Sequence, residues 1–290
     1  MKYLLSVILF LNAAFCLGQM RVYTGFIGEY PIQLTAYSYT DGFTNAFYAY
    51  DKFDTPISIK GTFDNNTLIL TELDEAGDTL AELVFTGTDL ASNELNGEWI
   101  NQVNNTKLNI RLTKSIEFDS FDDTEIEKSE FLQSQSTQNH YFKLLISKTP
   151  DEEVQVIGIR VYEKKTDKLL QEFEFNCRFL GLNNTFVGDY NFDGEEDFSV
   201  FEGNFAGANT SSIYILKSPE SGKYFMSDIT GTSLEFDYDA KLVYEYNQCC
   251  GGRNQTNTTY KIVNNKMVLI KEERLEYDDE KGDYIEVQCE

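Results

Sequence analysis

Apolar and polar side chains alternate along short segments between about residues 22 and 112, and turn-forming residues separate the segments. A period of two is the signature of strands that bury one face. The joints, among them 64–66 and 104–105, have the composition of tight turns. We therefore expect seven or eight strands in an antiparallel meander that curls into a barrel or a sandwich. The segments are 30–34, 47–50, 57–61, 68–70, 80–85, 97–99 and 108–112.

The second half of the chain resumes the strand pattern after an acidic, aperiodic stretch at 115–140. That stretch has the composition of a linker or a loosely docked helix. A chain of 290 residues is long enough for two domains, and the stretch is the natural boundary. Helical periodicity is weak throughout, so the sequence predicts a mainly β protein. Its parts are a barrel-like domain at 19–114, an acidic linker at 115–140 and a calcium-binding β domain at 141–290.

Residues 1–18 combine a lysine, an apolar run from Tyr3 through Phe15 and small residues near their end. This is the pattern of a secretory signal peptide, and no other stretch approaches the length of a membrane span. We therefore expect an exported protein, periplasmic or extracellular, without a transmembrane segment. A lipid anchor on Cys16 is the alternative, although Phe15 stands where a small residue is expected before a lipidated cysteine.

The segment 189–197 places oxygen-bearing side chains at every second position around Gly194. Ca²⁺ takes six to eight oxygen ligands, so a loop that binds it must turn sharply while its side chains point inward. The glycine permits that turn. The spacing predicts a calcium site that uses side-chain oxygens and one backbone carbonyl, from Asp189, Asn191, Asp193, Glu195 and Asp197.

The twelfth position of this loop is Val200, where a helix-loop-helix calcium site carries a bidentate Glu. Residues 198–201 are aromatic and β-branched, which favours a strand over an exiting helix. The sequence therefore predicts a structural calcium between strands and not a regulatory EF-hand. An acidic turn that binds nothing is the alternative, at the cost of holding carboxylates in mutual repulsion.

Four cysteines remain if Cys16 leaves with the signal peptide, in a compartment that permits disulfides. They are Cys177, Cys249, Cys250 and Cys289. Adjacent cysteines rarely pair with each other because the bridge is strained, so Cys249 and Cys250 are each expected to reach one of the other two. Buried free thiols are the alternative. The cysteines form no paired CxxC motifs and His140 is the only histidine, which argues against a zinc site.

Short segments in both halves of the chain carry a resemblance to a known family. They are 25–32, 48–50, 59–61, 70–72 and 97–99, then 187–194 and 209–214. Together they resemble a family of exported bacterial proteins related to calcium-binding periplasmic immunity proteins of Xanthomonas type IV secretion. Those relatives are similar to periplasmic lysozyme inhibitors and neutralise a peptidoglycan-cleaving effector. The segment 249–252 and Cys289 look like a variant of the family found among Bacteroidetes.

The resemblance implies an inhibitory contact, and we expect it in an exposed loop at 202–209 beside the metal. Calcium would order that loop before binding, which raises affinity. Phe205 and Asn209 are the expected anchors, flanked by small residues that let a partner approach closely. The candidate contact residues are Gly203, Asn204, Phe205, Gly207 and Asn209. The alternative is an ordinary connection between strands.

Composition and the absence of known catalytic motifs argue against several classes of function. A formal net charge of −24 argues against binding nucleic acid and would steer a cationic partner, such as a cell-wall hydrolase, to the surface. No serine triad or zinc hydrolase motif is present, so we expect no enzyme, although paired carboxylates for glycoside hydrolysis stay open. We expect a calcium-stabilised inhibitor or immunity protein against a lysozyme-like hydrolase. A secreted or surface module that binds polysaccharide or another protein through exposed tyrosines is the second hypothesis.

Overall fold

A computed structural model describes residues 18–119, 122–205 and 207–287 of the chain. Within these ranges the secondary structure is β-strand, with one 3₁₀ turn and no α-helix, so the mainly β prediction is confirmed. The same ranges contain no helix of the length and apolarity needed to cross a membrane. The predicted signal peptide, apart from Gly18, lies outside the described residues, and so do Cys16 and Cys289.

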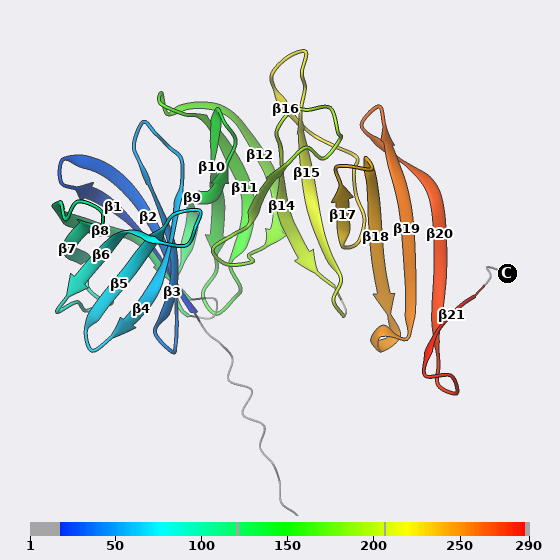
Figure 1. The fold of residues 1–290 in the computed structure, drawn as a ribbon, viewed down its shortest axis with the longest axis horizontal. Helices are drawn as coiled ribbons and strands as arrows, with labels where there is room; N and C mark the ends of the chain where they lie inside the picture. The colour runs from blue at the N-terminus through cyan, green and yellow to red at the C-terminus, as the bar shows by residue number, and fades with distance from the viewer. Residues whose placement is uncertain (1–17, 120–121, 206, 288–290) are drawn as a thin grey trace, which may run out of the picture.

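The first eight strands form a closed antiparallel barrel in which neighbours in the sequence are neighbours in space (Figure 1). Pairing of the first strand with the eighth closes the sheet, which leaves it without an edge. Tyr48, Leu70 and Phe85 are among the side chains that fill its interior, and each is at most 1% exposed. The strands are β1 (Gly18–Ile27), β2 (Tyr30–Tyr39), β3 (Phe43–Tyr50), β4 (Ile57–Asp64), β5 (Thr67–Leu73), β6 (Thr79–Thr86), β7 (Glu94–Asn101) and β8 (Lys107–Phe118).

Glycines allow close contact between barrel strands at two places. A Cβ on Gly61 would lie 1.7 Å from the Ile69 carbonyl oxygen, and one on Gly25 would lie 2.0 Å from that of Arg111. No side chain fits in either place, so the backbones approach there only because both residues lack a Cβ. The predicted meander is thus a barrel, closed by strand pairing and filled by side chains.

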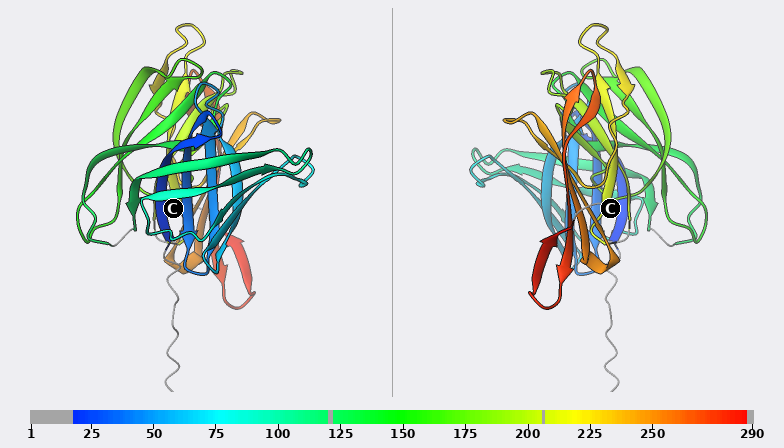
Figure 2. Two further views of the ribbon diagram at one scale, coloured as in Figure 1. Left: turned by 90° about the vertical axis from the view of Figure 1, so that its left-hand side faces the viewer. Right: turned by 90° about the vertical axis from the view of Figure 1, so that its right-hand side faces the viewer.

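Three open antiparallel sheets follow the barrel and stand beside one another, as the views in Figures 1 and 2 show. The first has the strand order β12-β11-β10-β9, the second β13 to β16 and the third β17 to β21. Their strands are β9 (Ile126–Ser136), β10 (His140–Lys148), β11 (Gln155–Glu163), β12 (Lys168–Arg178), β13 (Thr185–Gly188), β14 (Asp197–Asn204), β15 (Thr210–Lys217), β16 (Tyr224–Met226), β17 (Leu234–Asp237), β18 (Leu242–Cys249), β19 (Asn254–Val263), β20 (Lys266–Asp278) and β21 (Asp283–Glu286). The 3₁₀ turn η1 (Cys250–Gly252) joins β18 to β19.

The interpretation of 115–140 as a linker or a loosely docked helix is wrong. Its first residues end β8, and residues 126–136 form β9, which pairs with β10. Phe118, Ile126 and Phe131 are buried. The pairing of β9 with β10 contains two register shifts, and such irregularities break the alternation by which a strand is recognised.

One hydrophobic core continues from the barrel into the next two sheets. Met20 and Phe118 of the barrel belong to the same buried cluster as Phe142 of β10, Phe198 of β14 and Ile215 of β15. Phe142 and Phe198 are both fully buried, with ring centroids 4.4 Å apart. The barrel therefore does not pack separately from the sheets that follow it.

Candidate metal centre

The acidic loop at 189–197 connects β13 to β14, so it lies between strands as expected. Phe192 and Gly194 have φ values of 64° and 92°, which reverse the chain within a few residues. Asp197 ends the loop and is the first residue of β14. The local fold is a tight turn whose acidic residues are held close to their own backbone.

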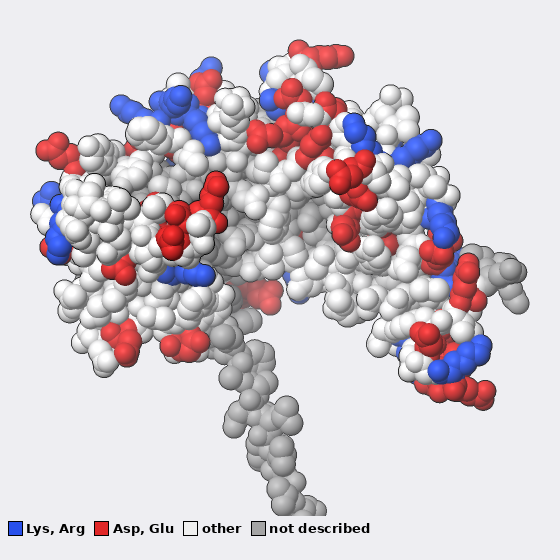
Figure 3. Space-filling model, in the orientation of Figure 1, with Lys and Arg blue, Asp and Glu red and all other residues white. Residues whose placement is uncertain are grey.

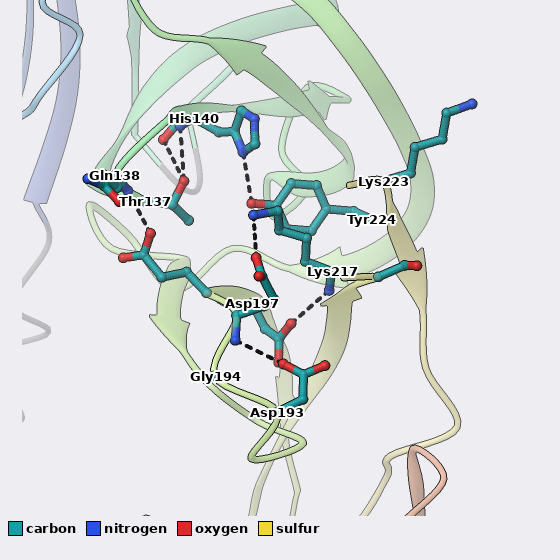
Figure 4. A network of polar contacts seen from close by, with 12 residues as sticks. Thr137, Gln138, His140, Asp193, Gly194, Asp197, Lys217, Lys223 and Tyr224 are labelled. Atoms are coloured by element: carbon teal, nitrogen blue, oxygen red, sulfur yellow. Dashed lines mark hydrogen bonds and ion pairs between the residues drawn. The ribbon is translucent and has the colours of Figure 1, made fainter. Parts of the chain in front are cut away.

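Hydrogen bonds from backbone N–H groups to the acidic side chains shape this turn (Figure 4). The two carboxylate oxygens of Asp189 accept the N–H groups of Asp193 and Gly194, at 3.0 and 2.9 Å. Asp193 in turn accepts the N–H of Glu195 at 2.9 Å. The Asn191 amide donates to Asp193 Oδ2 at 2.8 Å and to Asn265 Oδ1 at 2.9 Å. The side chains predicted as ligands thus surround one turn.

Asp197 is the buried member of the set, with 0% of its surface exposed. Its carboxylate accepts the backbone N–H groups of Tyr190 at 2.9 Å and Lys217 at 2.7 Å. Burial raises the pKa of Asp197 to about 7; the two N–H bonds oppose this shift, and the charges of Asp193 and Asp189 reinforce it. The Lys217 ammonium pairs with Glu195 instead, at 2.5 Å. Across the described ranges, no salt bridge reaches Asp197.

The donor chemistry of this loop suits calcium. Asp189, Asp193 and Asp197 supply carboxylate oxygens and Asn191 an amide oxygen, which are the hard ligands that Ca²⁺ takes. The buried carboxylate of Asp197 has no cationic partner, and a bound cation would neutralise it. However, no three acidic, histidine or cysteine side chains among the described residues converge closely enough to hold a metal ion as they stand. Calcium at this loop therefore stays a prediction.

Turns from other sheets meet the acidic loop. Glu196 accepts the N–H of Gln138 from the β9–β10 turn at 2.7 Å, and Lys241 donates to the Phe192 carbonyl at 3.2 Å. His140 shares a 3.0 Å hydrogen bond with the Tyr224 hydroxyl of β16 (Figure 4). The loop therefore fastens three sheets together at one end of their strands. These contacts are not predicted from the sequence, because residues 137 to 140 fall in the stretch that has the composition of a linker.

The predicted partner loop is not beside the acidic loop, and this expectation is wrong. The two loops lie at opposite ends of the eight-residue strand β14, about 23 Å apart for a rise of about 3.3 Å per residue. The two loops are close in sequence but not in space, because the whole of β14 lies between them. In an extended strand, eight residues are enough to separate two loops completely.

Asn209 is not available as a partner anchor. It is 7% exposed; its amide donates to the Gln248 carbonyl at 2.7 Å, and its oxygen accepts the Gln248 N–H at 3.0 Å. Gly203 is buried as well. Asn204, Phe205 and Gly207 are exposed, and Phe205 presents 57% of its surface to solvent. The hairpin end therefore combines an internal anchor with an exposed tip.

The disulfide expected at Cys177 is not formed. Its thiol is free and 3% exposed, enclosed in the core shared by the barrel and the sheets. Burial raises the pKa of Cys177 to about 12, so the thiolate is not populated near neutral pH. Cys249 and Cys250 are free and exposed, with Sγ atoms 3.0 Å apart. Whether either reaches Cys289 lies outside the described residues.

Comparison with known proteins assigns no family to the chain. No family model matches it, and no curated protein matches. Among solved structures, it is similar to a protein from Lactobacillus plantarum, at 10% identity and a TM-score of 0.32, over 93% of this chain and 95% of that one. It is also similar to the WD40 domain of SCAP from fission yeast, at 10% identity and a TM-score of 0.28, over 88% of this chain and 65% of that one. Likenesses this distant bear on neither the fold nor the function of this chain.

Proposed function

We propose that this protein is an exported, calcium-stabilised binding protein that inhibits a cationic cell-wall hydrolase. The observation that carries the proposal is Asp197, a fully buried carboxylate with hydrogen bonds but no cationic partner, at the end of a turn rich in oxygen donors. A hydrolase as the target rests on the family resemblance and on the net charge of −24.

Side-chain oxygens of Asp189, Asn191, Asp193 and Asp197, with the carbonyl of Glu195, would hold the ion. Bound calcium supplies positive charge that offsets the repulsion among the carboxylates. Since the turns of three sheets meet at this loop, its ordering would be transmitted to the β9–β10 turn through Glu196 and Gln138. Calcium would thus make this end of the molecule rigid before a partner arrives, which reduces the entropy lost on binding.

The partner surface belongs at the acidic-loop end of the sheets and not at the tip of the β14–β15 hairpin. Figure 3 shows Asp and Glu side chains gathering near the upper ends of β15 to β17, where the acidic loop lies. A negative surface attracts a cationic enzyme over distances of about a Debye length, roughly 8 to 10 Å at physiological salt. Encounter with the partner is therefore expected to slow as salt is added.

Two measurements test the proposal. Titration calorimetry should record calcium uptake by the wild-type protein, and Asp193→Ala should weaken it; Asp78→Ala, which removes a charge from an exposed turn of the barrel, should not. A turbidity assay with a cationic lysozyme should show inhibition that chelator reduces. If no heat of calcium binding were detected, the metal would drop out of the proposal. Full lysozyme activity in the presence of a saturating concentration of this protein would rule out lysozyme-like hydrolases as its target.

A groove favours a second candidate function, the binding of polysaccharide. It lies between the β3–β4 loop and the β11–β12 turn, has a volume of about 700 Å³ and is lined by Tyr50, Phe53 and Lys164 among others. Phe53 is 70% exposed, and aromatic faces with neighbouring polar groups suit sugar rings. Retention on insoluble peptidoglycan that Phe53→Ala abolishes would support this candidate over inhibition.

A further inference from the structure

Two neighbouring thiols converge at the β18–β19 turn, on the side of the protein away from the acidic loop. Cys249 is the last residue of β18 and Cys250 the first of η1. Both are exposed, and their Sγ atoms are 3.0 Å apart. Adjacent cysteines are strained partners, yet the structure brings the two sulfurs together.

The backbone explains why the sulfurs meet. Successive side chains of a regular strand point to opposite faces, which would separate two adjacent cysteines. Cys250 lies just past the strand with φ of 58°, and Gly251 and Gly252 follow with φ of 69° and 84°. Such values are rare for a residue with a Cβ. The left-handed backbone at Cys250 breaks the alternation, so both thiols lie on the same side.

We propose that Cys249 and Cys250 form a modification site, a vicinal dithiol that closes reversibly to a disulfide by exchange with an external disulfide. The thiolate of one cysteine attacks a sulfur of the external disulfide, forms a mixed disulfide and releases one external thiol. The thiolate of the second cysteine then attacks the mixed disulfide at the protein's sulfur and releases the second external thiol. The two protons lost by the cysteines pass to the two released thiols. The protein is oxidised by two electrons, and the external disulfide is reduced by two.

The exposure and strain of the pair make it exchangeable. Neighbouring Cα atoms across a trans peptide are about 3.8 Å apart, below the usual span of a disulfide, and strain of this kind makes a bridge easier to reduce. Because both sulfurs are exposed, the free thiols can reach an external disulfide, and an external thiol can reach the closed bridge. Cys177 differs in both respects, since it is buried and has no cysteine beside it in the sequence. Exchange should therefore be confined to the vicinal pair among the cysteines that the structure describes.

Tryptic peptides separate the cysteines and make the test direct. Cleavage after Lys241 and Arg253 isolates Cys249 and Cys250 in the peptide 242–253, while Cys177 falls in 169–178 and Cys289 in 282–290. The native protein would be equilibrated with oxidised or reduced glutathione, quenched with acid, alkylated and digested without reductant. After oxidised glutathione, we expect peptide 242–253 to be lighter by two hydrogen atoms than its dithiol form and to resist alkylation. Reduced glutathione should restore alkylation at both cysteines.

Single variants distinguish the vicinal bridge from other outcomes. Cys250→Ser should stop the reaction at a mixed disulfide between Cys249 and glutathione, because no second thiol is left to resolve it. Cys177→Ser should leave the behaviour of peptide 242–253 unchanged. Recovery of peptide 242–253 linked to 282–290 would overturn the proposal in favour of a bridge to Cys289. Full alkylation at both cysteines after oxidised glutathione, or two stable glutathione adducts, would overturn it too.

Discussion

The barrel and the terminal sheet of β17 to β21 are built from the same antiparallel pairing, yet they differ in how they end. Every barrel strand has a neighbour on both sides, and buried side chains fill the interior. In the terminal sheet, β21 pairs only with 275–278 of β20, so within the described chain the edge formed by 266–273 has no strand beside it. Figure 1 shows β21 beside only the lower part of β20 at this end of the molecule.

This difference shows in what the strands bury. The barrel holds Leu70, Leu83 and Phe85 at 0% exposure, whereas Leu269 and Ile270 of β20 are 57% and 52% exposed. Closure lets a sheet bury one complete face without help from another element. An open sheet buries only what its neighbour covers, and its stability therefore depends on that neighbour.

Truncating a large side chain in each region should give the largest contrast. Phe85→Ala should lower the free energy of unfolding by about 3–5 kcal/mol, because it removes buried surface and leaves a cavity. Ile270→Ala, which removes a side chain already half in solvent, should change it by less than about 0.5 kcal/mol. Urea unfolding followed by circular dichroism measures both. Similar losses for the two variants would show that the terminal sheet is as well packed as the barrel.

Calcium should stabilise the open sheets most strongly where the acidic loop joins them. Binding to the folded state alone adds about 2.7 kcal/mol at a free calcium concentration of one hundred times Kd. Chelator should therefore lower the melting temperature of the wild-type protein, and Asp193→Ala should melt at the same temperature with calcium or chelator. Hydrogen exchange should locate the effect at 185–201. A wild-type melting temperature that chelator does not change would contradict the prediction.

Asn209 tests how the terminal sheet is attached to its neighbour. Asn209→Ala would leave the N–H and C=O groups of Gln248 without their side-chain partner, at a cost of about 1–3 kcal/mol. Asn204→Ala is the matched control, since Asn204 is an exposed asparagine in the same hairpin. Faster hydrogen exchange in β18 and β19, without change in the barrel, is the expected signature. Equal effects of the two substitutions would mean that the bonds to Gln248 do not hold the sheets together.

The sequence predicts the closed barrel better than it predicts the open terminal sheet. In β6, Ala81, Leu83 and Phe85 are buried and alternate with less buried residues, so the pattern reports the fold directly. In β20, Met267 to Ile270 are apolar on both faces of an exposed strand, and no alternation marks which face packs. Local pattern is therefore informative where one face is completely buried, and it fails where burial depends on a distant neighbour.

In the candidate site, too, local features could be predicted from the sequence and long-range contacts could not. The turn at 189–197 could be recognised because its spacing around Gly194 is local. The burial of Asp197, the bonds from Asn209 to Gln248 and the meeting of Cys249 with Cys250 depend on strand ends and on residues elsewhere in the fold. One residue with a left-handed backbone was enough to reverse the expectation for the cysteines.

His140 reports on the middle of the molecule, between the two regions compared. Burial lowers its pKa from the ordinary value of 6.5, and the positive charge of Lys217 acts in the same direction. The neutral ring is therefore favoured in the fold. Its contribution to stability is complete above the unfolded pKa of 6.5 and is lost as pH falls toward the lower folded value.

His140 is the only histidine, so its ring protons can be followed by NMR without assignment. The titration midpoint in the native protein should lie below that in urea. Tyr224→Phe, which removes the hydrogen-bond partner but keeps the ring, should retain most of the difference if burial is its main cause. A native midpoint at or above the unfolded one would contradict the burial of this side chain.

The open edge of β20 should affect association more than stability. Unpaired N–H and C=O groups beside exposed apolar side chains form a template for strand pairing between molecules. Leu269→Lys places a charge on the edge, and it should change the free energy of unfolding by less than about 0.5 kcal/mol because the side chain is already mostly exposed. Light scattering on heating should nevertheless begin later than in the wild-type protein.

Val84→Lys, a charge added to the barrel at a partly buried position, is the contrasting control, since the barrel has no edge to protect. If Leu269→Lys left the onset of scattering unchanged, pairing at this edge would not be the route by which the molecules associate, and the contrast between a closed and an open sheet would concern stability alone.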